Sequence, residues 1–139
     1  MITDGEGRIL FDKTHHRDRA PFYWLPGGGV EPGETAAEAL ERELIEEAAL
    51  RIEVIRLLYL SENIFVESGD YRHEVILYFL ARPIGPTGGV PSDPREHEWH
   101  APDATPGPFM PRAVAEAVIA DFPEGFGRPV QHLVTVARP

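Results

Sequence analysis

The chain has 139 residues, a formal net charge of −10 and no cysteine, so it fits a single domain over residues 1–139 and offers neither disulfides nor thiolate chemistry. A strongly acidic chain lacks the basic face of a nucleic-acid binder. No apolar run approaches the roughly 20 residues of a membrane span, and the first residues lack the apolar stretch of a signal peptide, so we expect a cytoplasmic protein that binds neither nucleic acid nor membrane.

The expected elements mix strands and helices without a regular βαβ repeat. Short apolar-rich runs bounded by turn residues indicate strands, and apolar residues at helical spacing indicate two helices. In chain order we expect a strand at 8–13 paired with 1–3, a strand at 22–25, a helix at 35–49, one or two strands within 50–66, and then a strand at 71–82, a short strand near 96–102, a helix at 110–122 and a strand at 129–137. This order favours an α+β domain with a mixed β-sheet between helices.

The helix expected at 35–49 carries a cluster of carboxylates. At about 100° per residue, Glu43, Glu46 and Glu47 occupy one arc beside the apolar stripe rather than on the far solvent side. Like charges at this spacing repel, and Arg42 is the one nearby cation. Crowded carboxylates suit a hard divalent ion such as Mg²⁺ or Mn²⁺, whereas a solvated acidic face is the ordinary alternative.

A glycine-rich segment, PGGGVEPGE, directly precedes this helix. Glycines let backbone carbonyls and amides approach an ion or a phosphate closely. It is not a Walker loop, because no GK[ST] follows. An ordinary turn explains the segment taken alone, but its position next to the acidic helix favours binding of an ion or a phosphate.

Together, the loop and the helix resemble the signature of the Nudix hydrolase family, which reads Gly, five residues, Glu, seven residues, then Arg-Glu-aliphatic-x-Glu-Glu-x-Gly-aliphatic. The matching residues are Gly28, Glu34, Arg42, Glu43, Leu44, Glu46, Glu47 and Leu50. Ala49 stands where the family has the glycine that ends the helix, a position that is often costly for a residue with a Cβ. The resemblance implies a Nudix-type α/β/α sandwich and hydrolysis of a nucleoside diphosphate linked to another moiety.

The resemblance also implies roles for individual residues. Glu46 and Glu47 match the main metal ligands, and Glu43 matches a position that binds metal or acts as a base. The backbone carbonyl of Gly27 or Gly28 matches a further ligand. Arg42 and Glu34 match positions that orient the carboxylates and take no direct part in the chemistry. The implied cofactor is Mg²⁺ or Mn²⁺, which screens phosphate oxygens and lowers the pKa of bound water.

The general base is open at this stage, because members of this family use different bases. Glu43 is one candidate, and the candidates from outside the helix are Glu74, Glu96 and Glu98. The ordinary alternative for Glu74 is a strand residue that faces solvent, and for Glu96 and Glu98 it is a solvated loop edge.

Two groups near the glycine-rich segment also have two interpretations. The aromatic run Phe22–Trp24 is suited to stack on a nucleobase or to pack in the core. Three cations either hold a phosphate or lie in a solvated loop: Lys13, Arg17 and Arg19. The expected partner is a small-molecule nucleoside diphosphate derivative, and a homodimer is left open as the assembly.

Two competing functions use the same fold. Isopentenyl-diphosphate isomerases rely on a cysteine, which this chain lacks. A Nudix-like nucleotide-sensing module without turnover typically loses carboxylates of the motif, and all of them are present here. The first comparison disfavours an isomerase, and the second favours catalysis over sensing.

Overall fold

The computed structural model describes residues 1–16, 19–85 and 96–137. The elements in chain order are β1 (Ile9–His16), β2 (Arg19–Trp24), α1 (Ala36–Ala48), β3 (Ile52–Glu67), β4 (Asp70–Pro83), β5 (His97–His100), α2 (Arg112–Asp121), the 3₁₀ helix η1 (Phe122–Glu124) and β6 (Gln131–Val136). Each strand and helix expected from the sequence has a counterpart, and the segment after α1 is one long strand, β3. No helix in the described ranges is long and apolar enough to cross a membrane.

The described strands form two three-stranded sheets, where the sequence predicted one mixed sheet. The sheet of order β2-β1-β5 is antiparallel, and the sheet of order β4-β3-β6 is mixed because β3 and β6 run parallel. The N-terminal segment joins the two sheets, since Ile2 pairs with Ala81 of β4 and Thr3 pairs with Ile9 of β1. The expected pairing of residues 1–3 with the first strand is therefore present, and the same segment also contacts the second sheet.

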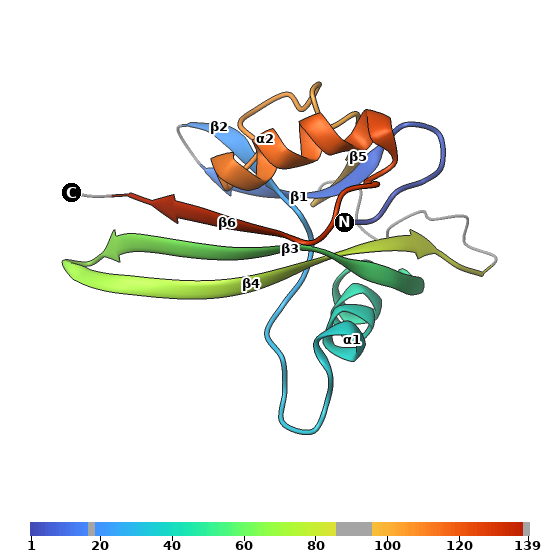
Figure 1. The fold of residues 1–139 in the computed structure, drawn as a ribbon, viewed down its shortest axis with the longest axis horizontal. Coiled ribbons are helices and arrows are strands. Elements are labelled where there is room, and N and C mark those ends of the chain that lie inside the picture. Colours follow the sequence, from blue (N-terminus) through green and yellow to red (C-terminus); the bar gives the residue numbers. More distant parts are fainter. Residues whose placement is uncertain (17–18, 86–95, 138–139) are drawn as a thin grey trace.

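The two helices lie on opposite sides of the β4-β3-β6 sheet (Figure 1). On the α2 side, Val118 and Phe11 of β1 belong to one apolar cluster. On the α1 side, Leu44 and Leu10 of β1 belong to a second cluster. All four side chains are at most 2% exposed, and burial of each contributes about 1.5–3 kcal/mol to folding. Consecutive residues of β1 thus pack on opposite faces of their strand.

This alternation decides which polar side chains of β1 and β5 reach α1. Asp12 shares its face with Leu10 and pairs across the ladder with His97 of β5. Glu98 pairs with Phe11 and therefore lies on the α2 side. The strands bring Asp12 and His97, but not Glu98, to the face covered by α1.

Candidate active site

A capping box fixes the start of α1 at the end of the glycine-rich segment. Thr35 Oγ1 accepts a hydrogen bond from the backbone N–H of Glu38 at 3.2 Å, and Glu38 Oε2 accepts one from the backbone N–H of Thr35 at 2.7 Å. These bonds pair donors that a helix start leaves unsatisfied. The hydrogen bonds from the Thr35 N–H and hydroxyl to the Glu38 carboxylate hold the pKa of Glu38 below its usual value. The direction of α1 is thereby set relative to the loop.

The end of α1 keeps the turn that the missing glycine would make. Ala49 has φ 49° and ψ 31°, in the left-handed region. Its N–H donates to the carbonyl of Ile45 at 3.1 Å, and the N–H of Leu50 donates to the carbonyl of Leu44 at 3.0 Å. These bonds satisfy the last carbonyls of the helix. The departure from the motif therefore leaves the turn intact, with the strain of a Cβ at a left-handed position.

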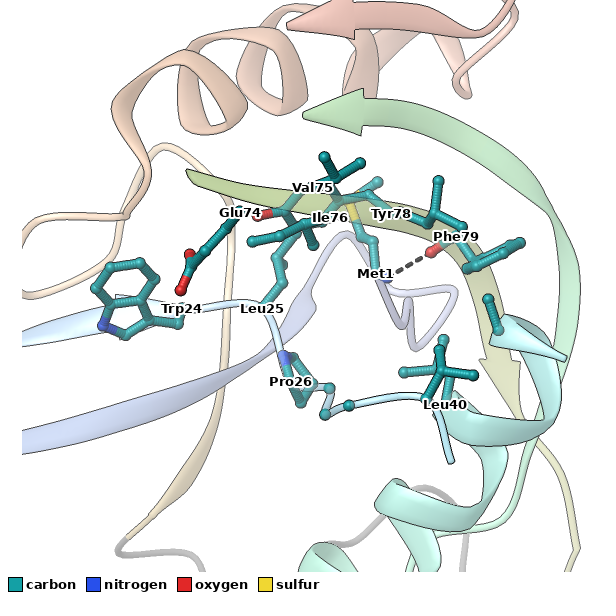
Figure 2. A pocket seen from close by; sticks show the side chains of 16 residues that line it. Met1, Trp24, Leu25, Pro26, Leu40, Glu74, Val75, Ile76, Tyr78 and Phe79 are labelled. Atoms are coloured by element: carbon teal, nitrogen blue, oxygen red, sulfur yellow. Dashed lines mark hydrogen bonds between the residues drawn. The ribbon is translucent and has the colours of Figure 1, made fainter. Parts of the chain in front are cut away.

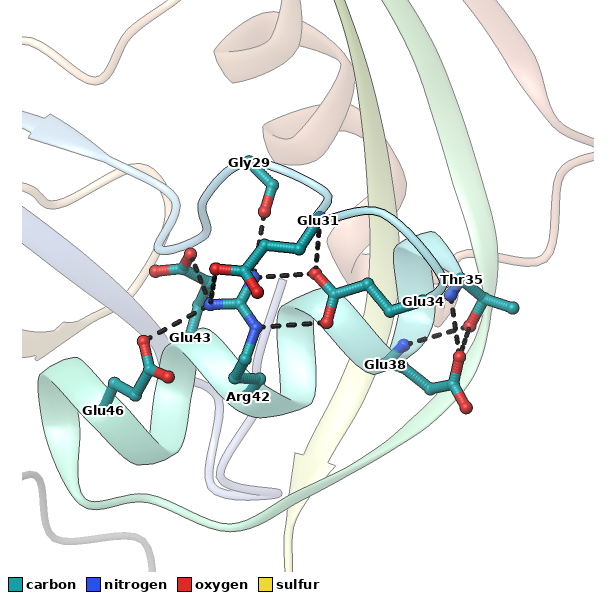
Figure 3. Close-up of polar contacts among 8 residues, drawn as sticks. All are labelled: Gly29, Glu31, Glu34, Thr35, Glu38, Arg42, Glu43 and Glu46. Carbon is teal, nitrogen blue, oxygen red and sulfur yellow. Dashed lines mark hydrogen bonds and ion pairs between the residues drawn. The ribbon is translucent and has the colours of Figure 1, made fainter.

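Arg42 ties the loop to the helix (Figure 3). Its Nε and Nη2 donate to the two carboxylate oxygens of Glu34 at 3.1 and 2.7 Å, and Nη2 also donates to the carbonyl of Gly29 at 3.0 Å. Its Nη1 donates to Glu43 at 2.9 Å and to Glu46 at 3.3 Å. The paired hydrogen bonds lower the pKa of Glu34 and raise that of Arg42. One guanidinium thus orients three carboxylates and a loop carbonyl.

The carboxylate of Glu43 packs directly on Gly28. A Cβ added at residue 28 would lie 2.2 Å from Cδ of Glu43 and within 2.5 Å of both carboxylate oxygens. The Glu43 side chain is 16% exposed, so it is held between the loop and Arg42. Glycine is therefore needed at 28 because a side chain carboxylate occupies the space, which is a reason that the sequence alone did not provide.

A cavity of about 560 Å³ opens beside the same loop. Its lining comes from the loop and adjoining residues Trp24–Val30, from Ala36 and Leu40, from Met1 and from Glu74–Phe79 of β4. The lining is mostly apolar, and Figure 2 shows Trp24 and Glu74 at one end of it. Trp24 is 39% exposed, which leaves an aromatic face for a ligand. Glu74 is exposed, as a strand-surface residue would be, and also lines the cavity.

Glu47 belongs to a different group of side chains. One ligand atom each from Asp12, Glu47 and His97 lies within 4.8 Å of the other two. The His97 side chain is 4% exposed, and its Nε2 lies 3.3 Å from Oδ1 of Asp12. Burial raises the pKa of Asp12 to about 6; the charge of His97 works against this rise, whereas Glu47 and Glu96 add to it.

The three carboxylates predicted on α1 therefore lie in two environments. Glu43 and Glu46 contact Arg42, whereas Glu47 meets Asp12 and His97. Sequence reasoning did not select these last two residues. The signal for Asp12 was a carboxylate inside the apolar run ILFD, on the same face as Leu10.

A family model for the NUDIX domain matches residues 1–122. The chain belongs to the NUDIX domain family. An RNA pyrophosphohydrolase of Erythrobacter litoralis is 29% identical over 88% of this chain and 86% of its own length. An NAD-capped RNA hydrolase, NudC, of Chromobacterium violaceum is 34% identical over 86% of this chain, which spans 43% of that protein.

Solved Nudix structures share the fold. The MutT NUDIX hydrolase from Burkholderia pseudomallei has a TM-score of 0.58 at 27% identity, over 83% of this chain and 88% of its own. A NUDIX hydrolase from Nitrosomonas europaea has a TM-score of 0.67 at 20% identity, over 95% of this chain and 73% of its own. The predicted family, the α+β Nudix sandwich and a Nudix hydrolase acting on phosphoanhydride bonds are therefore confirmed.

Glu98, a base candidate from outside the Nudix motif, lies on the α2 side. Lys13 Nζ and the Tyr23 hydroxyl donate hydrogen bonds to it at 2.7 and 3.0 Å, and His100 Nε2 lies 2.8 Å away. Burial by itself would raise the pKa of Glu98, but these hydrogen bonds outweigh it and bring the pKa to about 2. Lys13 is thus engaged by Glu98, and Tyr23 packs in the core.

Two other sequence candidates complete the placement. Glu96 is exposed and contributes charge near Asp12. The side chains of Arg17 and Arg19 lie outside the described residues. No role in the Nudix site is therefore assigned to Arg17 or Arg19.

The donor atoms of the Nudix site suit a divalent cation. The Glu46 side chain is 59% exposed, Glu47 is exposed, and Gly27 and Gly28 line the cavity with their backbone. Oδ1 of Asp12 is buried and, within the described ranges, accepts no hydrogen bond. Carboxylate and carbonyl oxygens are the ligands of hard divalent ions, so the residues present fit such an ion.

Proposed function

We propose that this Nudix hydrolase cleaves a diphosphate linkage in a nucleoside diphosphate derivative and depends on Mg²⁺ or Mn²⁺. One observation carries the proposal: residues 27–29 are shared between the carboxylate network and the cavity. Gly28 supports the Glu43 carboxylate, and Gly29 accepts a hydrogen bond from Arg42. The same three glycines line the cavity, so a ligand in the cavity lies next to the loop that positions the acids.

The proposed metal ligands are Glu43, Glu46 and Glu47, with the carbonyl of Gly27 or Gly28. When bound, a divalent ion would screen the phosphate oxygens and lower the pKa of its bound water. Arg42 would keep Glu43 and Glu46 in place, since it donates to both. It would act by orienting these carboxylates rather than by contact with the reacting atoms.

The cavity supports a nucleotide substrate. Trp24 offers a half-exposed ring on which a nucleobase can stack. The apolar lining of the cavity can contact the remaining surface of the same base. Glu74 is the carboxylate of the lining, and we assign to it the role of general base, accepting the proton of the attacking water. Glu43 is less available for this role, because Arg42 donates to it.

The experiment is a phosphate-release screen over nucleotide sugars, ADP-ribose, nucleoside triphosphates and dinucleoside polyphosphates, with Mg²⁺ and with Mn²⁺. Glu46→Gln and Glu47→Gln are each expected to lower kcat/KM about 100-fold or more, since each removes a charged ligand. Glu41→Gln is the matched control, because Glu41 lies on α1 outside the motif positions. Equal turnover by all variants would contradict the assigned roles, and nucleotide binding without hydrolysis would support a sensing module.

The role of Glu74 has its own test. Glu74→Gln is expected to lower kcat about tenfold or more. Glu67→Gln is the control, because Glu67 lies at the exposed end of β3 and pairs with Arg72. An unchanged kcat in Glu74→Gln would contradict this role and leave Glu43, Glu96 and Glu98 as the candidate bases.

Further properties are part of the same proposal. Pairing of β6 with β3 supports one domain over residues 1–139, and the predicted compartment is the cytoplasm. Size-exclusion chromatography with light scattering tests whether the protein forms a homodimer. The prediction of no nucleic-acid partner is tested by including an RNA with a 5′-triphosphate in the screen, because two relatives are named for RNA substrates.

A further inference from the structure

We propose that Asp12, Glu47 and His97 form a site for a first-row transition-metal ion, with one imidazole nitrogen and two carboxylate oxygens as ligands. The inference rests on the proposed function in that Glu47 is also a proposed ligand of the Nudix motif. It adds two residues from β1 and β5, which lie outside the motif, and it changes the chemistry of the donor set.

The first argument is geometric. Metal–ligand distances of about 2.1 Å place neighbouring ligand atoms about 3 to 3.4 Å apart. The ligand atoms of Asp12, Glu47 and His97 already lie within 4.8 Å of one another. Small side-chain adjustments would close such a site without moving the backbone. Of the described Asp, Glu and His side chains, only these bring three ligand atoms so close together.

A buried oxygen of Asp12 that accepts no hydrogen bond also supports the site. Oδ1 of Asp12 is buried and accepts no hydrogen bond from any described residue. It lies 3.3 Å from Nε2 of His97, on the strand face that α1 covers. A buried carboxylate oxygen without a hydrogen-bond partner costs free energy. An ion bound between these side chains would give this oxygen a ligand bond in addition to its ion pair with His97.

The third argument is charge. Glu47 lies in the last turn of α1, which holds no basic residue, and the C-terminal end of a helix is itself partially negative. Asp12 and Glu96 add further negative charge to this region. A divalent ion would neutralise both Asp12 and Glu47.

The donor set selects the class of ion. Carboxylate and carbonyl oxygens alone suit Mg²⁺ and Mn²⁺, whereas an added imidazole nitrogen favours Fe²⁺ or Zn²⁺ over Mg²⁺. The site also leaves coordination positions for water or for a phosphate oxygen, because it has three protein ligands. A preference for a transition metal over Mg²⁺ would therefore come from β5 and not from the Nudix motif.

The experiment uses Mn²⁺ as the probe and pulsed electron paramagnetic resonance as the readout. Coordination by His97 produces a modulation from the imidazole ¹⁴N nucleus, which oxygen ligands do not give. We expect this modulation in the wild-type protein and its loss in His97→Gln. His100→Gln should retain it, because His100 lies on the same strand but contacts Glu98 on the α2 side.

Several outcomes would overturn the proposal. These are no bound Mn²⁺, bound Mn²⁺ without nitrogen modulation in the wild type, or modulation that persists in His97→Gln. Circular dichroism checks that His97→Gln folds. If it does not fold, Asp12→Asn supplies the test, because it replaces a partly exposed carboxylate by an amide of the same shape. The affinity for Mn²⁺ should then fall at least tenfold. Unchanged affinity would count against the site.

This readout is independent of turnover. Hydrolysis without nitrogen modulation would remove the Asp12–Glu47–His97 site and leave the proposed function standing. Nitrogen modulation without hydrolysis of any substrate would leave the metal site standing and count against the proposed function.

Discussion

A Cβ atom at Gly28 would lie 2.2 Å from Cδ of Glu43. This contact joins the glycine-rich segment to α1 through a backbone and a side chain that are far apart in the motif. The backbone of Gly28 does not have a positive φ. The motif has glycine at this position because the Glu43 carboxylate occupies the space of a side chain.

The first prediction concerns Gly28→Ala. The atoms in conflict are the end of a flexible side chain, so the Glu43 carboxylate should move while the backbone stays, and stability should change by less than about 1 kcal/mol. Activity should fall about 10- to 100-fold, because a misplacement of about 1 Å in a catalytic site costs this much. Steady-state kinetics and thermal melts on the same preparation measure both effects.

The control is Gly29→Ala. A Cβ at residue 29 meets nothing within 4 Å, and the backbone carbonyl that accepts the Arg42 hydrogen bond is retained. A smaller loss of activity than in Gly28→Ala is expected, because Gly29 lines the cavity but its Cβ would not displace Glu43. Equal effects of the two substitutions would show that the Gly28–Glu43 contact has no special role.

The second prediction concerns Arg42→Lys. A lysine keeps the charge but cannot donate to Glu34, Glu43 and Gly29 at once. We expect a lower free energy of unfolding and at least a tenfold loss in kcat/KM. Denaturant unfolding and the phosphate-release assay measure these changes. Arg112→Lys is the control, because the exposed ion pair of Arg112 with Glu116 on α2 should contribute little to stability.

The third prediction concerns Ala49→Gly. Ala49 has φ 49°, where a Cβ is strained and glycine is not. Stability should rise by about 0.5–1 kcal/mol after the entropy cost of glycine, which corresponds to a Tm increase of roughly 2–4 °C. Activity should be unchanged, since no carboxylate is altered.

Ala48→Gly is the opposite case for comparison. Ala48 is fully buried inside the last turn of α1, so glycine there should lower stability by about 1 kcal/mol or more. A decrease in Tm for both variants would contradict the strain assigned to Ala49.

The fourth prediction concerns pH and Glu98. The folded protein holds the pKa of Glu98 at about 2, below its usual 4.5, so the ionised carboxylate contributes stability above pH 4.5. This stability is lost as the pH falls from 4.5 towards 2. Glu98→Gln should lower stability at pH 7 by about 2 kcal/mol, after allowance for solvent screening, and should flatten the dependence between pH 4.5 and 2.

Denaturant unfolding at several pH values measures this slope. Glu116→Gln is the control, because Glu116 is exposed on α2 and pairs only with neighbouring Arg112 among the described side chains. It should keep the wild-type slope. A wild-type slope in Glu98→Gln would contradict the stabilising role of the Lys13–Glu98–Tyr23 contacts.

The sequence predicted the parts of the site that depend on local spacing. The positions of Glu43, Glu46 and Glu47 on one helix follow from the helical repeat, and the helix expected at 35–49 agrees with α1 to within one residue at each end. These features require only a few consecutive residues, so the chain encodes them directly. The family resemblance rested on the same short segment.

The tertiary structure decided what each carboxylate meets. Asp12 and His97 reach Glu47 because two strands pair in one register, and a shift of one residue would bring Glu98 to that face instead. The sequence left Glu74, Glu96 and Glu98 open for this reason. Side chains alternate between the faces of a strand, and only the pairing of distant strands fixes which face is turned towards α1.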